Sequence, residues 1–119
     1  MKEFMLFIRT EGDPWQTMSP SEMQAHVQKG VAYIGDLMQK GIIKSAQPLD
    51  MTGVTISGKA GALRDGPFNE TKEVIAGYFH IVAKDLDEAV AIAKANPIFG
   101  DGLGARIEVR PVRTVDGIN

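Results

Sequence analysis

A carboxylate, an aromatic ring and a lysine fall within one short loop of this chain. The loop begins with the tetrapeptide DGPF at residues 65–68 and runs on to Lys72. Its glycine and proline alone are enough to make a tight turn, because glycine reaches backbone angles closed to other residues and proline fixes its own φ. The turn does not need Asp65, Phe68 or Lys72 beside them. We therefore expect this loop to carry part of a ligand-binding or catalytic site.

Each of these three side chains also has a structural role open to it. Asp65 can act as a general base or hold a ligand hydroxyl, or it can cap the turn by accepting hydrogen bonds from nearby backbone N–H groups. Phe68 can stack on a ligand or anchor the loop in the core. Lys72 can bind an anion or remain a solvated charge. Both alternatives stay open at each position.

A second candidate site follows from strand alternation, which places successive side chains on opposite faces of a sheet. Strands are predicted from Phe4 to Ile8, from Val74 to Ala83 and from Arg106 to Val112. One face is apolar and is expected to pack against helices: Phe4, Leu6, Ile8, Phe79, Ile81, Ala83, Ile107 and Val109. The other face mixes apolar, aromatic and charged residues: Met5, Phe7, Arg9, Tyr78, His80, Val82, Arg106, Glu108 and Arg110.

The mixed face carries groups able to transfer protons and to bind anions. His80 can serve as an acid–base group because imidazole titrates near neutral pH, and a hydrogen-bonded core histidine is the alternative. Arginine binds carboxylates and phosphates through two parallel hydrogen bonds. The same arginines can instead form ion pairs with Glu108 that fix the strand register. The ligand-binding candidates on this face are Arg9, Tyr78, Arg106, Glu108 and Arg110.

Capping signals place two helices between these strands. The sequence SPSE at residues 19–22 predicts a helix start, and Gly41 is placed to end that helix. Residues 85–88 predict the start of a second helix, which Asn96-Pro97 closes. Residues 51–64 are typical of a β-hairpin. The order predicts an α+β fold: a ferredoxin-like antiparallel sheet with two helices on one face plus an extra β-hairpin.

An apolar patch of the size of the mixed face usually marks an interaction surface. Two such sheets facing each other would bury the patch and leave a cavity lined by aromatic, basic and acidic groups. We therefore expect a homodimer with C2 symmetry, the commonest closed oligomer. A monomer with an open amphipathic face is the alternative.

Composition sets the remaining bounds. A chain of 119 residues is expected to form one domain over residues 1–113, with residues 114–119 as a loosely held tail. A net charge of −2 with scattered basic residues argues against nucleic-acid binding, and no apolar run approaches the length of a membrane helix. With no cysteine and two histidines far apart in sequence, we expect no metal site and no cofactor. A cytoplasmic location is expected.

Two loops are less informative. Trp15 can cover a pocket or pack at the entry of the first helix. The segment Gly100-Asp101-Gly102-Leu103-Gly104 is expected to be a flexible loop. It precedes a strand and does not open a helix, so it lacks the helix dipole of a phosphate-binding loop.

An ordered set of motifs runs along nearly the whole chain. It consists of SPSEM at 19–23, DGPF at 65–68, TKE at 71–73, GYF at 77–79, DLDEA at 85–89, NP at 96–97 and EVRPV at 108–112. In these motifs the chain resembles the YCII-related proteins, in particular the branch with a DGPF signature. The resemblance implies a ferredoxin-like fold that dimerises as an α+β barrel, in agreement with the strand alternation.

The resemblance also implies where chemistry lies in some relatives. They carry a His–Asp pair proposed to be catalytic, with the histidine on the first helix and the aspartate near the end of the second. Gly30 stands at that histidine position here and Asn96 at that aspartate position. Neither side chain does acid–base chemistry at neutral pH. His26, one helical turn earlier, is a substitute imidazole, although its position also fits a surface histidine.

Two functions follow from these residues. The first is a small-molecule-binding or accessory homodimer of unassigned activity, with a ligand cavity between its two sheets; the departure from the His–Asp pair favours it. The alternative is a cofactor-independent lyase, isomerase or hydrolase acting on a small polar or anionic metabolite. In that enzyme His80 or Asp65 would transfer protons, and Arg9 or Lys72 would hold the anion.

Overall fold

The structure, a computed structural model, describes residues 1–66 and 73–119. A four-stranded antiparallel sheet has the order β2-β5-β1-β6, and β3 and β4 form a separate two-stranded sheet. The strands are β1 (Lys2–Glu11), β2 (Ile43–Pro48), β3 (Thr55–Lys59), β4 (Ala62–Gly66), β5 (Glu73–Ala83) and β6 (Arg106–Pro111). The helices are α1 (Pro14–Thr17), α2 (Pro20–Gln39), α3 (Leu86–Lys94) and the 3-10 helix η1 (Pro97–Gly100).

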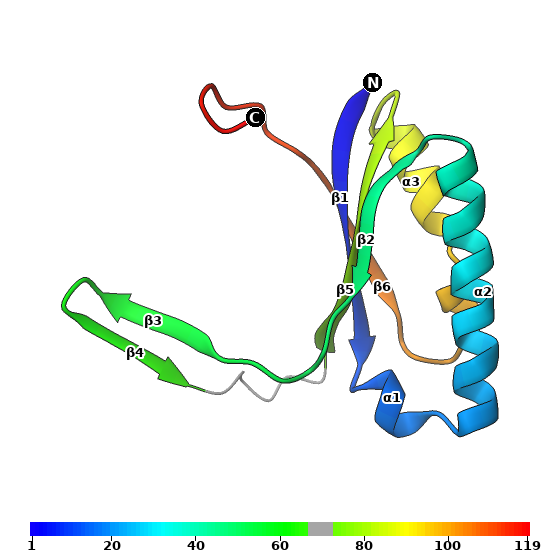
Figure 1. The fold of residues 1–119 in the computed structure, drawn as a ribbon, viewed down its shortest axis with the longest axis horizontal. Coiled ribbons are helices and arrows are strands. Elements are labelled where there is room, and N and C mark those ends of the chain that lie inside the picture. The colour runs from blue at the N-terminus through cyan, green and yellow to red at the C-terminus, as the bar shows by residue number, and fades with distance from the viewer. Residues whose placement is uncertain (67–72) are drawn as a thin grey trace.

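This order and pairing are those of a ferredoxin-like fold, so the predicted fold class is confirmed. Figure 1 shows α2 and α3 on one face of the main sheet, while the opposite face has no helix over it. The predicted hairpin is present as β3 and β4. Among the described helices, none combines the length and hydropathy needed to cross a bilayer.

Both long helices begin where the capping signals predict. Ser19 caps α2 and forms a capping box with Glu22: the Glu22 N–H donates to Ser19 Oγ at 3.2 Å, and the Ser19 N–H donates to Glu22 Oε1 at 3.0 Å. Asp85 caps α3 by accepting from the Glu88 N–H at 2.9 Å. Gly41 follows α2 with φ of 70°, a left-handed angle that favours glycine. The sequence therefore fixes where α2 begins and ends.

The core lies between this sheet and its helices, as strand alternation predicts. Its buried strand residues are Phe4, Leu6, Ile8, Phe79, Ile81 and Ala83. Ile107 and Val109 are partly buried and pack against the same cluster. Leu37 and Ala89 join this core from the helical layer, with 5% and 0% of their surfaces exposed, as do Ala93, Ile98 and Leu103.

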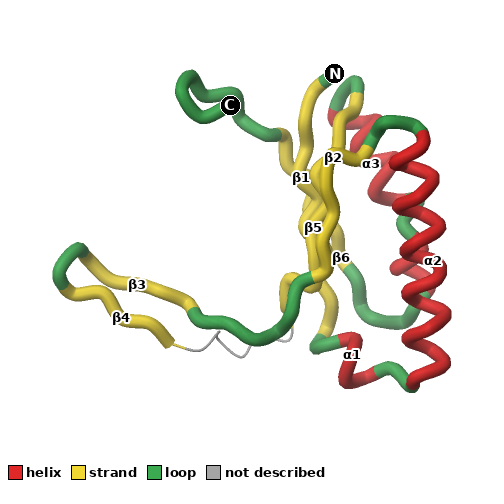
Figure 2. Tube along the Cα trace, viewed as in Figure 1, coloured by secondary structure: helices red, strands yellow, loops and turns green. Residues whose placement is uncertain are grey.

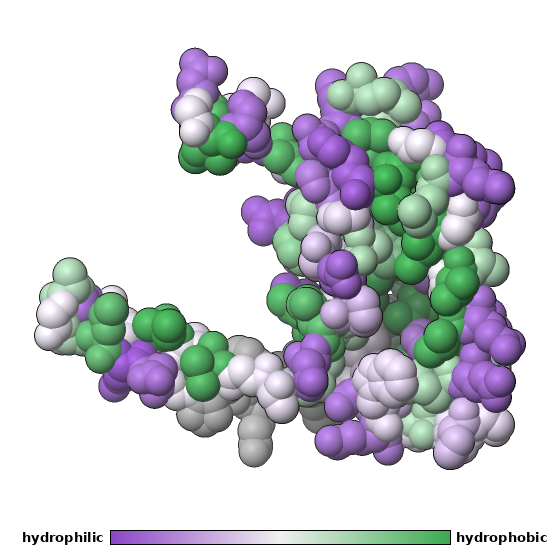
Figure 3. All heavy atoms as spheres, in the orientation of Figure 1, coloured by the Kyte–Doolittle hydropathy of each residue, from purple (hydrophilic) through white to green (hydrophobic). Residues whose placement is uncertain are grey.

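The helix-free side carries two projecting segments. Figure 2 shows the β3–β4 hairpin and the C-terminal segment both extending from that side of the sheet. The hairpin packs little of its own surface: Ile56 and Leu63 are 67% and 65% exposed, and Figure 3 shows apolar side chains along it. The radius of gyration is 16.3 Å, against roughly 13.5 Å for a compact domain of this length. The single chain is therefore more extended than a closed globule.

Candidate functional site

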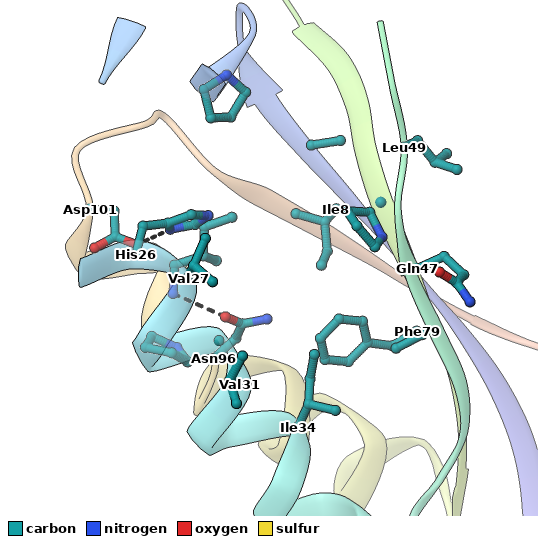
Figure 4. A pocket seen from close by; sticks show the side chains of 18 of the residues that line it. Ile8, His26, Val27, Val31, Ile34, Gln47, Leu49, Phe79, Asn96 and Asp101 are labelled. Atoms are coloured by element: carbon teal, nitrogen blue, oxygen red, sulfur yellow. Dashed lines mark hydrogen bonds and ion pairs between the residues drawn. The ribbon is translucent and has the colours of Figure 1, made fainter. Parts of the chain in front are cut away.

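A pocket of about 390 Å³ lies between α2 and the main sheet. This volume falls in the usual range for small-molecule sites. Figure 4 shows Val27, Val31 and Ile34 on the α2 side, facing Ile8 and Phe79. The remaining lining is also mainly apolar: Pro14, Trp15, Gly30, Ala46, Gln47, Pro48, Leu49, Met51, Ala76, Gly77, Pro97 and Ile98, together with His26, Asn96 and Asp101.

Gly77 sets the width of the pocket at the β5–β2 side. A Cβ at this position would lie 2.8 Å from the Gln47 carbonyl oxygen and 3.3 Å from Pro48 Cα. Any larger residue would therefore push β2 away from β5. Close packing of β5 against β2 thus explains why the GYF motif has glycine at this position, at the edge of the pocket.

An imidazole–carboxylate pair stands at one end of the pocket. His26 Nδ1 lies 2.6 Å from Asp101 Oδ2, and Lys29 Nζ lies 2.9 Å from the other carboxylate oxygen. The Asp101 side chain is 5% exposed, whereas those of His26 and Lys29 are 24% and 50% exposed. Figure 4 shows the His26 ring between Asp101 and the pocket interior. Asp101 is thus a buried anchor that holds a partly accessible imidazole.

The electrostatics of the pair favour an ionised aspartate. Burial by itself would raise the pKa of Asp101, but hydrogen bonds from His26 and Lys29 outweigh burial and hold that pKa below its ordinary value of 3.8. An ionised carboxylate only accepts hydrogen bonds, so Nδ1 of His26 must carry the proton between them. In a neutral imidazole the lone pair then sits on Nε2. This is the arrangement of a general base whose tautomer is set by its partner.

The loop that supplies Asp101 is anchored at both ends. Asn96 caps η1, the Asp101 N–H donates to the Ile98 carbonyl at 3.1 Å, and Leu103 is 7% exposed. The Leu103 carbonyl accepts from the Glu11 N–H at 3.0 Å, which ties the loop to the end of β1. The sequence predicted a flexible loop here; its side chains Asp101 and Leu103 are instead buried in the fold.

The predicted site on the mixed face is assembled by the strand register, on the side of the sheet opposite to α2. Met5 pairs with both His80 and Arg110, and Phe7 with both Tyr78 and Glu108. Arg9 pairs with Arg106 and Val82 with Glu3, which completes the predicted set on this face. The pocket does not include any of these residues. Their assignment to a ligand stays a prediction.

His80 on this face has a specific partner. Its Nε2 lies 2.7 Å from Glu3 Oε1, and Lys44 Nζ lies 2.9 Å from the same oxygen. The hydrogen bond from Lys44, and then that from His80, hold the pKa of Glu3 below its ordinary value. Glu108 and Arg110 form an exposed ion pair at 3.9 Å, in line with the ion-pair alternative for them.

The predicted loop site is only partly described. Asp65 lies in β4, opposite Ile56 of β3, and is exposed. This strand belongs to the projecting hairpin and does not line the pocket. Phe68 and Lys72 lie outside the described residues.

Comparison with a family model places the chain among known proteins. The model of the YCII-related domain matches residues 3–113. The chain belongs to the YCII-related family. The resemblance seen in its motifs is therefore confirmed.

A solved structure has the same architecture as this YCII-related chain. It is 5-chloro-2-hydroxyhydroquinone dehydrochlorinase from Burkholderia phenoliruptrix AC1100, in complex with 2,5-dihydroxybenzoquinone. The two chains are 17% identical, the TM-score is 0.51, and the match covers 95% of each chain. The likeness supports the α+β fold described above. No curated protein matches the chain.

The two positions at which this YCII-related chain departs from the expected His–Asp pair both line the pocket. Gly30 and Asn96 are part of its wall, beside His26 and Asp101. An imidazole–carboxylate pair is thus present in the same pocket, but from residues one helical turn before Gly30 and five positions after Asn96. The sequence indicates His26 as a substitute imidazole but gives no signal for Asp101, because a glycine-rich loop that precedes a strand lacks the pattern of a binding site.

Proposed function

We propose that this YCII-related protein is an enzyme that transfers a proton on a small molecule bound between α2 and the sheet. The observation that carries the proposal is the His26–Asp101 pair at the end of a largely apolar pocket. His26 accepts the proton at Nε2, and the Asp101 carboxylate stabilises the imidazolium that forms. Lys29 holds Asp101 in its ionised state from the solvent side.

The lining defines the class of substrate. A pocket with this many aliphatic and aromatic groups gains most from a ligand whose body is apolar. The acidic proton must lie at one end of that body, next to His26. A cyclic molecule with a C–H bond acidified by a neighbouring carbonyl meets both conditions. A lyase or isomerase reaction begins with such a proton transfer. The dehydrochlorinase with a similar fold was solved with a flat ring compound, 2,5-dihydroxybenzoquinone.

The two histidines of the chain offer a matched test. The probe is 2-tetralone, a ring ketone whose acidic C–H protons exchange with deuterium, followed by NMR in D2O. We expect wild-type protein to accelerate this exchange over buffer, and His26→Gln to reduce the acceleration by about 10²-fold or more. His80→Gln, on the opposite face, should exchange like wild type. Equal rates for wild type and His26→Gln would contradict the assignment, and loss in His80→Gln alone would favour the mixed face.

A binding module without turnover is the second candidate function. The glycine and asparagine at the positions of the expected His–Asp pair favour it, because the pocket then retains its shape while losing that pair. Binding of 2-tetralone by wild type, with no exchange above buffer, is the result expected for this candidate. Bound ligand would raise the free energy of unfolding by RT ln(1 + [L]/Kd), about 2.7 kcal/mol at a hundredfold excess over Kd.

We also propose that the protein is a homodimer joined through the mixed face. Phe7, Tyr78 and Val82 on that face are only half-buried in the single chain, and the projecting hairpin exposes Ile56 and Leu63. A second copy would cover both features, and a cavity between the facing sheets stays a prediction of this arrangement. Light scattering should give twice the chain mass of 12.9 kDa. The pocket that holds His26 lies within one chain and does not require this interface.

A further inference from the structure

The amide of Asn96 is a buried polar group whose orientation is set by the backbone. Asn96 is 9% exposed and caps η1, with its Oδ1 accepting from the Ile98 N–H at 3.0 Å. A backbone N–H can only donate, so the oxygen of the amide must face Ile98. The NH2 group is therefore turned the other way. Figure 4 shows it directed from Asn96 towards the Phe79 side of the pocket.

This NH2 group has no hydrogen-bond partner among the described residues. Among the described residues, every fully buried side-chain nitrogen and oxygen has a hydrogen-bond partner. Because Nδ2 of Asn96 has none, it is not fully buried, and we place it at the surface of the pocket that Asn96 lines. A donor in a mainly apolar wall is satisfied by water when no ligand is bound, and a ligand that displaces this water leaves the donor unpaired unless the ligand accepts from it. The pocket thus presents two polar functions to a ligand: an imidazole lone pair on His26 and an amide donor on Asn96.

We propose that Asn96 determines specificity by donating from Nδ2 to a carbonyl oxygen of the ligand, a role that rests on the proposed proton transfer at His26. His26 Nε2 takes the proton from the carbon next to that carbonyl. The C–H bonding pair becomes the C=C bond of an enolate, and the carbonyl π pair moves onto the oxygen facing Asn96. Return of a proton from His26 to the same carbon restores the ketone. A donor aimed at such an oxyanion contributes about 10²–10³ to a rate.

The residue type at position 96 matters because aspartate would present a hydrogen-bond acceptor to the pocket where asparagine presents a donor. In Asn96→Asp one carboxylate oxygen still accepts from the Ile98 N–H, since aspartate is as good an N-cap as asparagine. The second oxygen would then be an acceptor in place of the donor. The variant keeps the cap of η1 and replaces the donor in the pocket wall by a negatively charged acceptor. The chain therefore selects ligands that carry an acceptor at this point, such as ring ketones.

Two probes of the same shape test the role: 2-tetralone, which carries the acceptor, and tetralin, which lacks it. Dissociation constants for both are measured by NMR titration of wild type and Asn96→Asp. We expect the ratio of the tetralin to the 2-tetralone dissociation constant to fall about tenfold or more in Asn96→Asp. In wild type, the side-chain amide proton resonances of Asn96 should shift further downfield with 2-tetralone than with tetralin, which acts on them only through the ring current that the two probes share. This second measurement does not depend on the variant folding.

An unchanged ratio in folded Asn96→Asp, or Asn96 amide proton resonances that shift no further downfield with saturating 2-tetralone than with tetralin, would overturn the inference. The proposed function fails separately. If His26→Gln loses exchange while Asn96→Asp leaves the ratio of dissociation constants unchanged, proton transfer by His26 is supported and the donor role of Asn96 is wrong. If Asn96→Asp lowers the ratio while His26→Gln exchanges like wild type, the donor role is supported and proton transfer by His26 is wrong.

Discussion

At the scale of single residues, the candidate site depends on which hydrogen bonds the side chains of Asp101 and Asn96 make. Asp101 has one oxygen for His26 and one for Lys29, while Asn96 gives its oxygen to the backbone. The sequence showed the histidine and the asparagine as individual positions. It could not show the pair, because His26 and Asp101 are 75 positions apart and meet only through the packing of η1 against α2.

Replacing the buried carboxylate tests this division of bonds. Asp101→Asn should lower the free energy of unfolding at pH 7 by about 1.5–3 kcal/mol, the usual range for a hydrogen bond to a charged group. Asp36→Asn is the matched control. Its side chain is 55% exposed and pairs with Lys40 one turn along α2, so its loss should matter by less than about 0.5 kcal/mol. Urea unfolding of both variants gives the comparison, and equal effects would mean that burial of Asp101 adds nothing.

The same carboxylate predicts a dependence of stability on pH. The folded-state pKa of Asp101 is lowered, so its contribution is complete above its ordinary pKa of 3.8 and is lost as the pH falls through the lower folded-state value. Wild type should therefore lose stability on acidification more steeply than Asp101→Asn. Urea unfolding at pH 5, 4 and 3 measures both slopes. Parallel slopes would show that Asp101 titrates normally in the folded protein.

At the scale of elements, the sequence was most informative where capping residues and periodicity agree. The starts of α2 and α3 were predicted from Ser19 and Asp85. The short helices were missed for a physical reason: Asp13-Pro14 and Asn96-Pro97 each supply an N-cap followed by proline at the first helical position. The sequence pattern at Asn96-Pro97 was interpreted only as the end of the second helix, and no helix was predicted from Asp13-Pro14. A four-residue helix has no periodicity to correct such an interpretation.

Helix α2 offers a paired substitution that separates stability from the pocket. Gly30 and Gly35 both lie inside the helix, and a Cβ at either would meet no atom within 4 Å. Alanine at either position should raise the free energy of unfolding by about 0.5–1 kcal/mol, because glycine loses more backbone entropy in a helix. Only Gly30 lines the pocket. We expect Gly30→Ala alone to change the affinity for 2-tetralone, and an equal change in Gly35→Ala would place the probe elsewhere.

Tyr33 connects α2 and α3, and its raised pKa predicts a loss of folding stability at alkaline pH. Its hydroxyl donates to the Ile92 carbonyl of α3, and burial raises its pKa to about 12. The unfolded chain ionises near pH 10, so the stability due to Tyr33 is complete below that pH and is lost as the pH rises towards 12. Tyr33→Phe should lower stability by about 1 kcal/mol at pH 7 and flatten the alkaline loss. Ultraviolet titration of wild type should show a tyrosine transition near pH 12 that is absent in the variant.

At the scale of the whole molecule, the pocket and the mixed face lie on opposite sides of the main sheet. The pocket is complete beneath α2, while the mixed face and the hairpin extend away from it (Figure 1). The sequence predicted the fold and the contents of the mixed face, because strand alternation is a local rule. It placed the ligand on that face. The pocket on the other side depends on how far α2 stands from the sheet, which no local pattern encodes.

A charge at the centre of the mixed face tests the division between the two sides. Phe7 lies between Tyr78 and Glu108 in the register, so in a C2 dimer through this face Phe7→Glu would bury like charges near the axis. We expect the variant to run as a 12.9 kDa monomer by light scattering at micromolar concentration.

Met38→Glu is the control on the helix side, where Met38 is 63% exposed, and should keep the mass of wild type. Because the pocket belongs to one chain, monomeric Phe7→Glu should retain exchange that depends on His26. A dimeric Phe7→Glu would place the interface elsewhere, and a monomer without exchange would show that the pocket needs its partner.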